Sequence, residues 1–292
     1  MILSHIIGGL GNQMFQYAAA RALSLANDVP LRLDVRDFAG YRLHQGFELS
    51  RVFVCNPEIA TDEDVRDLLG WRASWFARKI LTRPGFAVLR GSRLVVEPQF
   101  NYWPDIRLVS HNTYLVGYWQ SEKYFSDASE CIREDFVFRQ SFSGQNVEIA
   151  RKIDKTTAVS LHVRRGDYIS HAKTNAVLGL CSLSYYREAI MHIAERVENP
   201  EFFIFSDDIA WVKECLEIDF PCNYVDHNQG SESYNDMHLM SLCRHHIIAN
   251  SSFSWWGAWL GSNIDKIIIA PRNWFATGKD VKDLYPDGCV II

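Results

Sequence analysis

Short apolar segments alternate with helical patterns along this 292-residue chain, and this alternation constrains the fold more strongly than any other feature of the sequence. An apolar, β-branched stretch at Ile2–Ile7 is followed by a glycine-containing loop, a helix-forming stretch at Met14–Leu25 and a second strand-like stretch at Leu31–Asp34. This order predicts a β-α-β unit at the start of the chain. Since consecutive parallel strands need a crossover connection, usually a helix, the alternation predicts parallel sheets covered by helices.

The same alternation is clearest in the second half of the chain. Apolar strands are predicted at Ala158–Val163, Phe202–Phe205, His246–Ala249 and Ile267–Ile269, and helices at Ser184–Val197, Ile209–Leu216 and Tyr234–Cys243. Between residues 48 and 95 the sequence is polar and aromatic, with candidate helices at Asp62–Leu69 and Trp75–Leu81. The stretch most typical of a linker is Gln140–Asn146. We therefore predict two domains, at residues 1–145 and 146–292.

Composition and overall charge exclude several classes of protein and partner. Hydrophobic residues make up 48% of the chain and charged residues 22%, which is enough apolar material for substantial cores and argues against a disordered chain. The formal charge is −5 and the pI is near 6.1, so the chain as a whole has no attraction for nucleic acid or for anionic lipid. A bound phosphate would therefore need a local cluster of arginine.

The cysteines and the apolar runs indicate a cellular compartment. The seven cysteines are an odd number without C-x-x-C spacing, which argues against a disulfide framework or a structural zinc site. The stretch Met1–Ile7 has neither a basic region nor a long apolar core, so we expect no signal peptide. The apolar runs are far shorter than the ~20 residues needed to span a bilayer. We expect a cytoplasmic protein without a transmembrane segment.

The strongest local signal is the motif HVRRGDY at residues 162–168, which places two guanidinium groups and a carboxylate just beyond an apolar strand. Open α/β sheets bind ligands at the ends of strands. Arg164 is in phase with His162 along the strand, whereas Arg165 should point elsewhere. A guanidinium matches the geometry of a phosphate, and such a charge-assisted hydrogen bond contributes roughly 1.5–3 kcal/mol. The alternative is a surface arginine pair with Asp167 as its ion-pair partner.

A glycine-containing loop, Gly8–Gln13, lies between the first predicted strand and the first predicted helix. Glycine lets backbone N–H groups approach a ligand, and the N-terminus of the following helix favours an anion. The dinucleotide fingerprint would need a third glycine where Met14 stands, so dinucleotide binding is poorly supported. A tight β-α turn without ligand contact is an equally good interpretation of Gly9 and Gly11.

A serine-rich stretch, Asn250–Gly257, follows an apolar strand and precedes a predicted helix. It places three hydroxyls and several amides at the start of that helix, which suits a diphosphate. The alternative is that the serines cap the helix and the tryptophans fill the core. We expect both, with Trp255 and Trp256 packing behind a functional backbone.

Two acidic positions are candidates for contacts with a nucleotide. The strand Phe202–Phe205 runs into Ser206, Asp207 and Asp208, a pair of aspartates of the kind that can bind a metal and a diphosphate. Because arginine and amide-rich loops can neutralise a diphosphate, a metal is not required, and Asp207 could instead accept hydrogen bonds from the backbone or the nucleoside. Asp236, just ahead of a helical stretch, could accept guanine N–H groups or cap that helix. The histidines have no metal-binding spacing, so we expect no metal site.

Four motifs together carry a family resemblance: GGLGNQMFQYA at residues 8–18, HVRRGDY at 162–168, FIFSDD at 203–208 and IIANSSFSWWGAWLG at 247–261. They resemble the α-1,2-fucosyltransferases of glycosyltransferase family 11, and the likeness extends to Gly117–Glu122 and Ile267–Pro271. The resemblance implies a GT-B-like α/β fold with two Rossmann-type halves and a cleft between them. It also implies inverting transfer of L-fucose from GDP-β-L-fucose to the 2-hydroxyl of a terminal galactose, with no metal or other cofactor.

The resemblance also implies roles for individual residues. Arg164 matches the arginine that contacts the donor diphosphate, and His162 matches its neighbour on the strand. Asp167 is the candidate base for the acceptor hydroxyl. The other positions expected to bind the donor are Gly9, Gly11, Asn12, Ser206, Asp207, Asp236, Ser251, Ser252 and Phe253. Residues 1–145 would form the mainly acceptor-side half, and residues 146–292 the half that binds GDP-fucose.

The implied acceptor is a galactose-terminated oligosaccharide of the lactose or O-antigen type, and no nucleic acid partner is expected. Animal and plant relatives carry an N-terminal membrane anchor that this sequence lacks, so the chain looks like a bacterial, cytoplasmic member. A membrane-bound glycolipid acceptor would bring such a protein to the inner membrane as a peripheral protein.

Three other functions are alternatives. The related α-1,6-fucosyltransferases share the H-x-R-R-x-D pattern, which leaves the linkage less certain than the donor. A nucleotide-sugar oxidoreductase or epimerase would need a full G-x-G-x-x-G and usually a Y-x-x-x-K pair, and neither occurs here. A non-enzymatic glycan-binding protein could use the nine tryptophans and twelve tyrosines to stack on sugars, although most large aromatic residues belong to cores.

Overall fold

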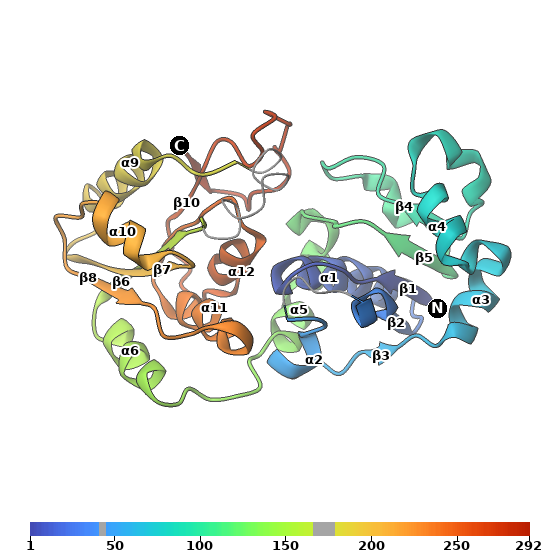
Figure 1. Cartoon of the computed structure of the whole chain (residues 1–292), viewed down its shortest axis with the longest axis horizontal. Coiled ribbons are helices and arrows are strands. Elements are labelled where there is room, and N and C mark those ends of the chain that lie inside the picture. Colours follow the sequence, from blue (N-terminus) through green and yellow to red (C-terminus); the bar gives the residue numbers. More distant parts are fainter. Residues whose placement is uncertain (41–44, 166–178) are drawn as a thin grey trace. The chain divides into compact units, whose positions relative to one another are not determined.

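The computed structural model of the chain describes residues 1–40, 45–165 and 179–292, and it contains two compact α/β units (Figure 1). Unit 1 comprises Met1–Arg139 and Lys282–Leu284, and unit 2 comprises Gln140–Val281 and Tyr285–Ile292.

The sequence predicted a division after residue 145, whereas the structure divides the chain in front of the linker-like stretch. The linker residues belong to unit 2 because they pack on one of its helices. The hydroxyl of Tyr234 donates a hydrogen bond to Gln140 Oε1 at 3.1 Å, and the ring of Phe142 stacks on His238 with a centroid distance of 4.0 Å.

Unit 1 is built on a five-stranded parallel sheet of order β3-β2-β1-β5-β4. Its strands are β1 (Ile2–His5), β2 (Leu31–Asp34), β3 (Glu58–Ile59), β4 (Leu94–Val96) and β5 (Thr113–Val116). Its α-helices are α1 (Leu10–Ala26), α2 (Leu49–Val52), α3 (Asp62–Leu69), α4 (Trp75–Leu81) and α5 (Ser129–Asp135). Short 3-10 helices are η1 (Arg36–Gly40), η2 (Gly70–Ala73), η3 (Pro84–Arg90), η4 (Pro104–Leu108), η5 (Glu122–Tyr124) and η6 (Ser126–Ala128).

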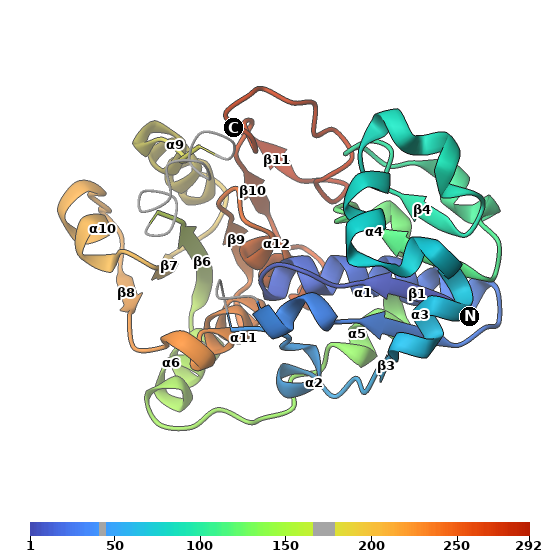
Figure 2. The same cartoon turned by 45° about the vertical axis from the view of Figure 1, so that its right-hand side comes forward.

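Helices cover both faces of this sheet, as the alternation of side chains along β1 requires. Leu3 belongs to a core with Leu68 of α3 and Leu81 of α4. The next residue, Ser4, faces the other way and donates a hydrogen bond from its hydroxyl to the carbonyl oxygen of Gln16 in α1, at 3.3 Å. Figure 2 shows α1 running alongside β1. Hence α1 covers one face, and α3 and α4 cover the other.

Unit 2 is built on a six-stranded parallel sheet of order β11-β10-β9-β6-β7-β8. Its strands are β6 (Thr157–Val163), β7 (Pro200–Ser206), β8 (Cys222–Val225), β9 (His245–Ile247), β10 (Ile268–Ala270) and β11 (Val290–Ile291). Its described helices are α6 (Gln145–Asp154), α9 (Leu183–Ala194), α10 (Ile209–Cys215), α11 (Tyr234–Leu242), α12 (Ser252–Leu260) and the 3-10 helix η7 (Gly230–Glu232).

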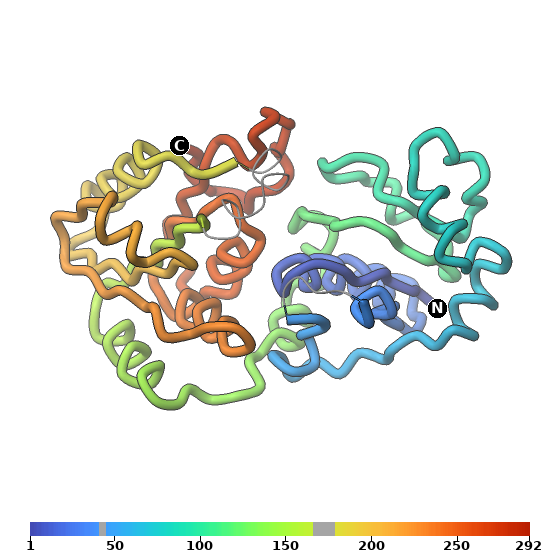
Figure 3. The backbone as a smooth tube through the Cα atoms, viewed as in Figure 1, coloured from blue at the N-terminus to red at the C-terminus, as the bar shows by residue number. Residues whose placement is uncertain are grey.

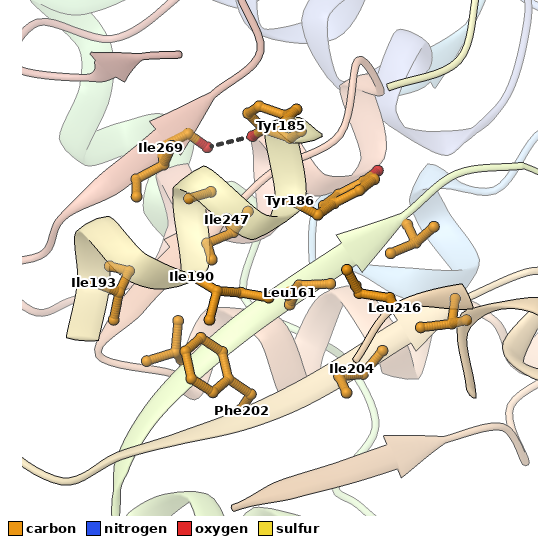
Figure 4. Packing of buried hydrophobic residues seen from close by; sticks show 14 of the residues in the cluster. Leu161, Tyr185, Tyr186, Ile190, Ile193, Phe202, Ile204, Leu216, Ile247 and Ile269 are labelled. Atoms are coloured by element: carbon orange, nitrogen blue, oxygen red, sulfur yellow. Dashed lines mark hydrogen bonds between the residues drawn. The ribbon is translucent and has the colours of Figure 1, made fainter. Parts of the chain in front are cut away.

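The central strands of unit 2 are buried on both faces. On one face Phe202 and Ile204 of β7 pack with Ile190 of α9 (Figure 4). On the other face Phe203 and Phe205 pack with residues of α11. Burial on both faces explains why the strands read as continuous apolar runs rather than as alternating patterns.

The predicted fold class is confirmed, since both units are parallel-stranded α/β structures of the Rossmann type. The predicted strands of the second half occur within two residues of their expected bounds, and α3 and α4 have the predicted bounds. The sequence patterns missed β3, β4, β5, β8 and β11. These strands are two to four residues long.

Candidate functional site

The sheet of unit 2 reverses its strand order at β6. From β6 the chain passes through α9 to β7 and through α10 to β8, and it then returns to place β9 on the other side of β6. In open α/β sheets such a switch point leaves a crevice at the carboxyl ends of the two central strands, and ligands bind there. Arg164 directly follows β6, and the serine-rich stretch follows β9 after two residues. Both predicted phosphate-binding segments thus belong to the switch point.

Arg164 is oriented by a carboxylate from the neighbouring strand. Its Nη1 lies 3.2 Å from Asp207 Oδ2, and Asp207 Oδ1 accepts a hydrogen bond of 2.8 Å from the backbone N–H of Arg165. About a quarter of each charged side chain in the Arg164–Asp207 pair is exposed. A guanidinium carries five N–H donors, so the ion pair is compatible with a simultaneous contact to phosphate. Asp207 therefore contacts both the side chain of Arg164 and the backbone of Arg165.

Arg165 is held in a different environment from Arg164, as the strand phase predicted. Its guanidinium carbon lies 4.0 Å from the ring centroid of Trp211, and its Nε lies 3.4 Å from Asp208 Oδ2. The other oxygen of Asp208 accepts the backbone N–H of Trp211 at 3.2 Å and caps α10. The two adjacent aspartates therefore pair with the two adjacent arginines. Among the described residues no group of three or more His, Cys, Asp and Glu side chains could hold a metal ion.

His162 is a buried, neutral imidazole at this switch point. Its pKa is lowered to about 3, mainly by burial and also by the nearby Arg164 cation, while Asp207 opposes the shift. The ring lies 6.0 Å, centroid to centroid, from Phe253. Its Nδ1 is buried and has no hydrogen-bond partner within the described part of the chain. Buried polar atoms in folded proteins nearly always have a partner, so this nitrogen is a candidate for contact with a ligand or water.

The serine-rich stretch forms the N-terminus of α12. Ser251 is the N-cap, and its hydroxyl oxygen accepts the backbone N–H of Phe253 at 3.3 Å. The hydroxyl of Ser254 accepts the N–H of Ala249 and donates to the carbonyl oxygen of Ser251, both at 3.3 Å. The helix then opens with Ser252, at the end where the helix dipole attracts an anion.

The tryptophans of the same motif lie behind that helix end. Trp255 and Trp256 are both essentially inaccessible to solvent. Their ring centroids lie 5.0 Å apart in an edge-to-face arrangement. The serine cap and the core tryptophans therefore occur as one interpretation of the sequence predicted.

Asp236 lies in a polar network of unit 2. Its Oδ1 accepts a hydrogen bond of 2.8 Å from Asn228 Nδ2, and the side chains of Asn228 and Asn146 are joined in both directions at 2.9 Å. His227 Nε2 lies 2.8 Å from Asn146 Oδ1. Burial raises the pKa of Asp236 to about 7, although the hydrogen bond from Asn228 opposes the shift.

The predicted capping role of Asp236 is wrong. The side chain lies inside the first turn of α11, and the N-cap position of that helix is Ser233. Sequence reasoning also missed Asn146 and Asn228, because neither belongs to a motif and they are 82 residues apart.

The sheet of unit 1 has its own switch point, at β1, which lies between β2 and β5. The glycine-containing loop follows β1, and Gly9 is the N-cap of α1, with its carbonyl oxygen accepting the N–H of Asn12 at 2.9 Å. Gly11 and Asn12 lie in the first turn of α1. Gln120, which follows β5, donates a hydrogen bond of 2.7 Å to Asn12 Oδ1. Asn12 thus joins the loops on the two sides of the switch point.

Part of the glycine motif is structural. Gln13 is fully buried, and its Nε2 donates to the carbonyl oxygens of Gly8 and Gly46, while its Oε1 accepts the N–H of Glu48. Gly8 has φ +83, and a Cβ at that position would lie 2.9 Å from Asn12 Nδ2. The glutamine and the first glycine of the motif therefore stabilise a tight β-α turn.

Ser206 and Asp167 are the remaining predicted site residues. The hydroxyl oxygen of Ser206, at the end of β7, accepts the backbone N–H of Asp208 at 3.0 Å, so it contributes to the turn that carries both aspartates. Asp167, the candidate base, lies outside the described residues.

Comparison with known proteins gives a family match over most of the chain. The family model described as glycosyl transferase family 11 matches residues 105–285. The α-1,2-colitosyltransferase of Escherichia coli is 36% identical over 276 residues, which cover 94% of this chain and 92% of that protein. The O-antigen biosynthesis glycosyltransferase WbnK of Escherichia coli is 32% identical over 301 residues, which cover 96% of each chain.

A solved structure supports the fold independently of sequence identity. The fucosyltransferase NodZ from Bradyrhizobium superposes with a TM-score of 0.51 at 15% identity, over 88% of this chain and 91% of that one. Within the described residues no helix is both long enough and apolar enough to cross a membrane.

Proposed function

Because this chain belongs to glycosyl transferase family 11, we propose that it transfers L-fucose from GDP-β-L-fucose to the 2-hydroxyl of a terminal galactose, with inversion to an α-1,2 linkage and without a metal. The observation that carries the proposal is the position of Arg164. It follows β6 at the sheet edge that also carries the N-terminus of α12, so a guanidinium and a helix dipole are both available to a diphosphate there.

The chemistry follows from the departure of GDP. As the bond between fucose and phosphate breaks, positive charge develops on the sugar and negative charge develops on the diphosphate. Arg164 and the first turn of α12 stabilise that negative charge, and His162, Ser251, Ser252 and Phe253 surround it. A preorganised positive environment lowers the barrier because it need not reorganise during the reaction.

The remaining proposed contacts involve the nucleoside of the donor and the acceptor. The ionised carboxylate of Asp236 accepts guanine N–H groups, and Ser206 and Asp207 hold the loop that carries Arg164. Gly9, Gly11 and Asn12 of unit 1 bind substrate through their loop. Asp167 is the proposed base that removes the proton from the acceptor hydroxyl.

A second donor sugar, colitose, also has support. The relative at 36% identity is named a colitosyltransferase, and colitose is fucose without the 3-hydroxyl. A site that hydrogen-bonds the 3-hydroxyl of fucose would reject colitose strongly, because buried polar groups would then lack partners. A site without such a contact would accept both donors. The similarity of the fold to a fucosyltransferase and the four sequence motifs favour fucose.

The α-1,2 linkage and the acceptor class rest on the two Escherichia coli relatives, one named for an α-1,2 transfer and the other for O-antigen biosynthesis. A galactose-terminated oligosaccharide of an O-antigen, with lactose as a small substitute, fits both. The proposed location is the cytoplasm.

The test is a transfer assay with purified protein, lactose and an excess of EDTA, run in parallel with GDP-fucose and GDP-colitose. We expect GDP release with GDP-fucose and a product whose NMR spectrum gives an α-1,2 linkage to galactose. Transfer that stops with EDTA and resumes with Mg²⁺ would refute metal independence. Exclusive use of GDP-colitose would show that colitose, and not fucose, is the sugar transferred. A different linkage in the product would show that a hydroxyl other than the 2-hydroxyl of galactose is the acceptor.

A further inference from the structure

Unit 1 carries a cluster of exposed aromatic and aliphatic side chains that its fold does not need. We call the surface of η2, α4 and η3 the basic aromatic surface, and Figure 3 follows the chain through these three short helices. Its exposed apolar side chains are Trp71, Trp75, Phe76, Phe86, Val88 and Leu89, with exposed fractions from 41% to 95%. Exposed apolar residues are ordinary singly, whereas clusters of large ones mark interaction sites.

The three helices are held to one another and to the core, so the surface has a defined structure. Leu81 of α4 is buried in the core of unit 1, while Trp75 and Phe76 of the same helix are exposed. Arg72 Nε donates to the carbonyl oxygen of Leu89 at 2.7 Å and joins η2 to η3. Arg90 Nε donates to the carbonyl oxygen of Leu81 at 2.7 Å and joins η3 to α4.

The charge of this surface is opposite to that of the chain. From Gly70 to Val96 the sequence has six basic residues and no acidic residue, whereas the whole chain has a formal charge of −5. These residues are Arg72, Arg78, Lys79, Arg83, Arg90 and Arg93. Arg78 is only 13% exposed and pairs with the buried Asp34, and Arg93 lies beyond η3, so Lys79 and Arg83 are the exposed cations of the surface, with Arg72 and Arg90 partly exposed. Two of these cations lie beside exposed rings, with Arg72 Cζ 4.9 Å from the Trp71 centroid and Lys79 Nζ 4.8 Å from the Trp75 centroid.

We propose that the basic aromatic surface binds the anionic headgroups of a lipid bilayer and anchors the protein peripherally through Trp75 and Phe76. Tryptophan at the level of the headgroups with lysine and arginine around it is the side-chain combination that favours a membrane interface. Each cation near an anionic surface adds to the attraction, and apolar insertion supplies the second signal that stable binding needs. The negative net charge of the whole chain predicted no affinity for anionic lipid. Binding depends instead on the charge of the surface that faces the lipid, which here is positive.

The charge contribution is tested by co-sedimentation of the full chain with vesicles of phosphatidylcholine and phosphatidylglycerol. We expect binding to vesicles with roughly a quarter anionic lipid, no binding to pure phosphatidylcholine, and weakening at about 0.5 M NaCl. The Lys79→Glu/Arg83→Glu variant should lose at least ~10-fold in partitioning. Its matched control, Arg151→Glu/Lys155→Glu in unit 2, makes the same change in net charge at exposed positions and should bind as before.

The apolar contribution is tested with Trp75→Ser/Phe76→Ser against Leu108→Ser/Ile264→Ser, whose side chains are 83% and 93% exposed elsewhere on the chain. Only the first variant should release the protein from vesicles, and thermal unfolding should confirm that both variants fold.

Three results would overturn the proposal: no binding to anionic vesicles, equal binding to neutral vesicles, or equal loss in a test variant and its control. A chain that self-associates through these residues, seen by sedimentation without lipid, would make the surface an interface between copies instead. No donor or acceptor takes part, so these outcomes are independent of the proposed reaction.

Discussion

At the scale of single residues, Arg164 and Arg165 are neighbours in sequence with separate environments. Arg164 pairs with Asp207 at the switch point, whereas Arg165 stacks on Trp211 and pairs with Asp208. Because only the first lies with the α12 N-terminus at the proposed diphosphate site, the two side chains should have different effects on turnover and stability.

Replacing Arg164 with alanine should therefore reduce turnover by at least ~100-fold, the scale observed when one donor that stabilises a developing charge is removed. The matched change, Arg165→Ala, removes one cation from the same loop and should instead cost about 1 kcal/mol of stability through the lost ring stacking and ion pair, with most turnover retained. Steady-state kinetics and urea unfolding of both variants distinguish these effects. Unchanged turnover in Arg164→Ala would remove this residue from the mechanism.

Asp236 links the proposed nucleoside site to the pH dependence of stability. Its pKa is raised from 3.8 to about 7, mainly by burial. Between these two values the folded state keeps a proton that the unfolded state has released, so this group's contribution to stability is present below pH 4 and is lost as pH rises through 7.

The Asp236→Asn variant should show a flatter dependence of thermal stability on pH between about 4 and 7, and higher stability than the wild type at pH 8. Its amide oxygen can still accept the hydrogen bond from Asn228, but its amide nitrogen cannot accept a guanine N–H, so the KM for the donor should rise. Calorimetry at several pH values and donor kinetics measure both effects. Asp226→Asn, at an exposed position two residues before Asn228, is the control, and parallel curves for wild type and Asp236→Asn would contradict the assignment.

At the scale of elements, the position of the α12 N-terminus depends on close packing between α11 and α12. A Cβ on Gly257 of α12 would lie 2.9 Å from Met240 Cβ of α11. Because that atom is fixed to the backbone of α11, a larger residue at position 257 requires the two helices to separate.

Gly257→Ala should therefore destabilise the protein by up to about 2 kcal/mol, since overpacking costs about 1–3 kcal/mol and the helix preference of alanine over glycine offsets ~1 kcal/mol of that cost. Donor affinity should fall with it, because the displaced helix carries Ser251 and Phe253 at its start. Gly85→Ala, where an added Cβ meets nothing within 4 Å, should change stability by less than ~0.5 kcal/mol. Denaturant unfolding decides the question, and a Gly257→Ala protein as stable as the wild type would disprove the tight contact.

At the scale of the whole molecule, the two units have separate hydrophobic cores. Leu3 belongs to the core of unit 1 and Leu161 to a core of unit 2. The residues proposed to bind the diphosphate, including Arg164 and the α12 N-terminus, all lie in unit 2. A ligand that binds only the folded form of one unit raises the stability of that unit.

We expect calorimetry to resolve two unfolding transitions, of which GDP raises the one that belongs to unit 2. At GDP concentrations about 100-fold above its dissociation constant the gain should be ~2.7 kcal/mol. Leu3→Ala and Leu161→Ala, each costing about 2–5 kcal/mol in its own core, identify which transition belongs to which unit. If GDP shifted only the transition of unit 1, the nucleotide would bind unit 1 and the proposed site in unit 2 would be refuted.

Much of the fold and part of the site could be predicted from local pattern. The apolar segments around Leu161 and Phe203 had to become buried parallel strands, since helical stretches separate them and both faces must be covered. The helix at Asp62–Leu69 has its predicted bounds, and Thr61 and Asp64 form a capping box at its start.

The sequence alone therefore determined the α/β class, the motifs that follow the strands and the membership of a glycosyltransferase family. Only the tertiary structure decided the strand order, which places β6 between β7 and β9, and the partners that the motif residues take. Asp207 reaches the Arg165 backbone across 42 residues, Asn146 reaches Asn228 across 82, and Gln120 reaches Asn12 across 108. Hydrophobic periodicity acts over a few residues and specifies burial, whereas these contacts form only when the folded sheet brings loops and helix starts that are distant in sequence to the same end of its strands.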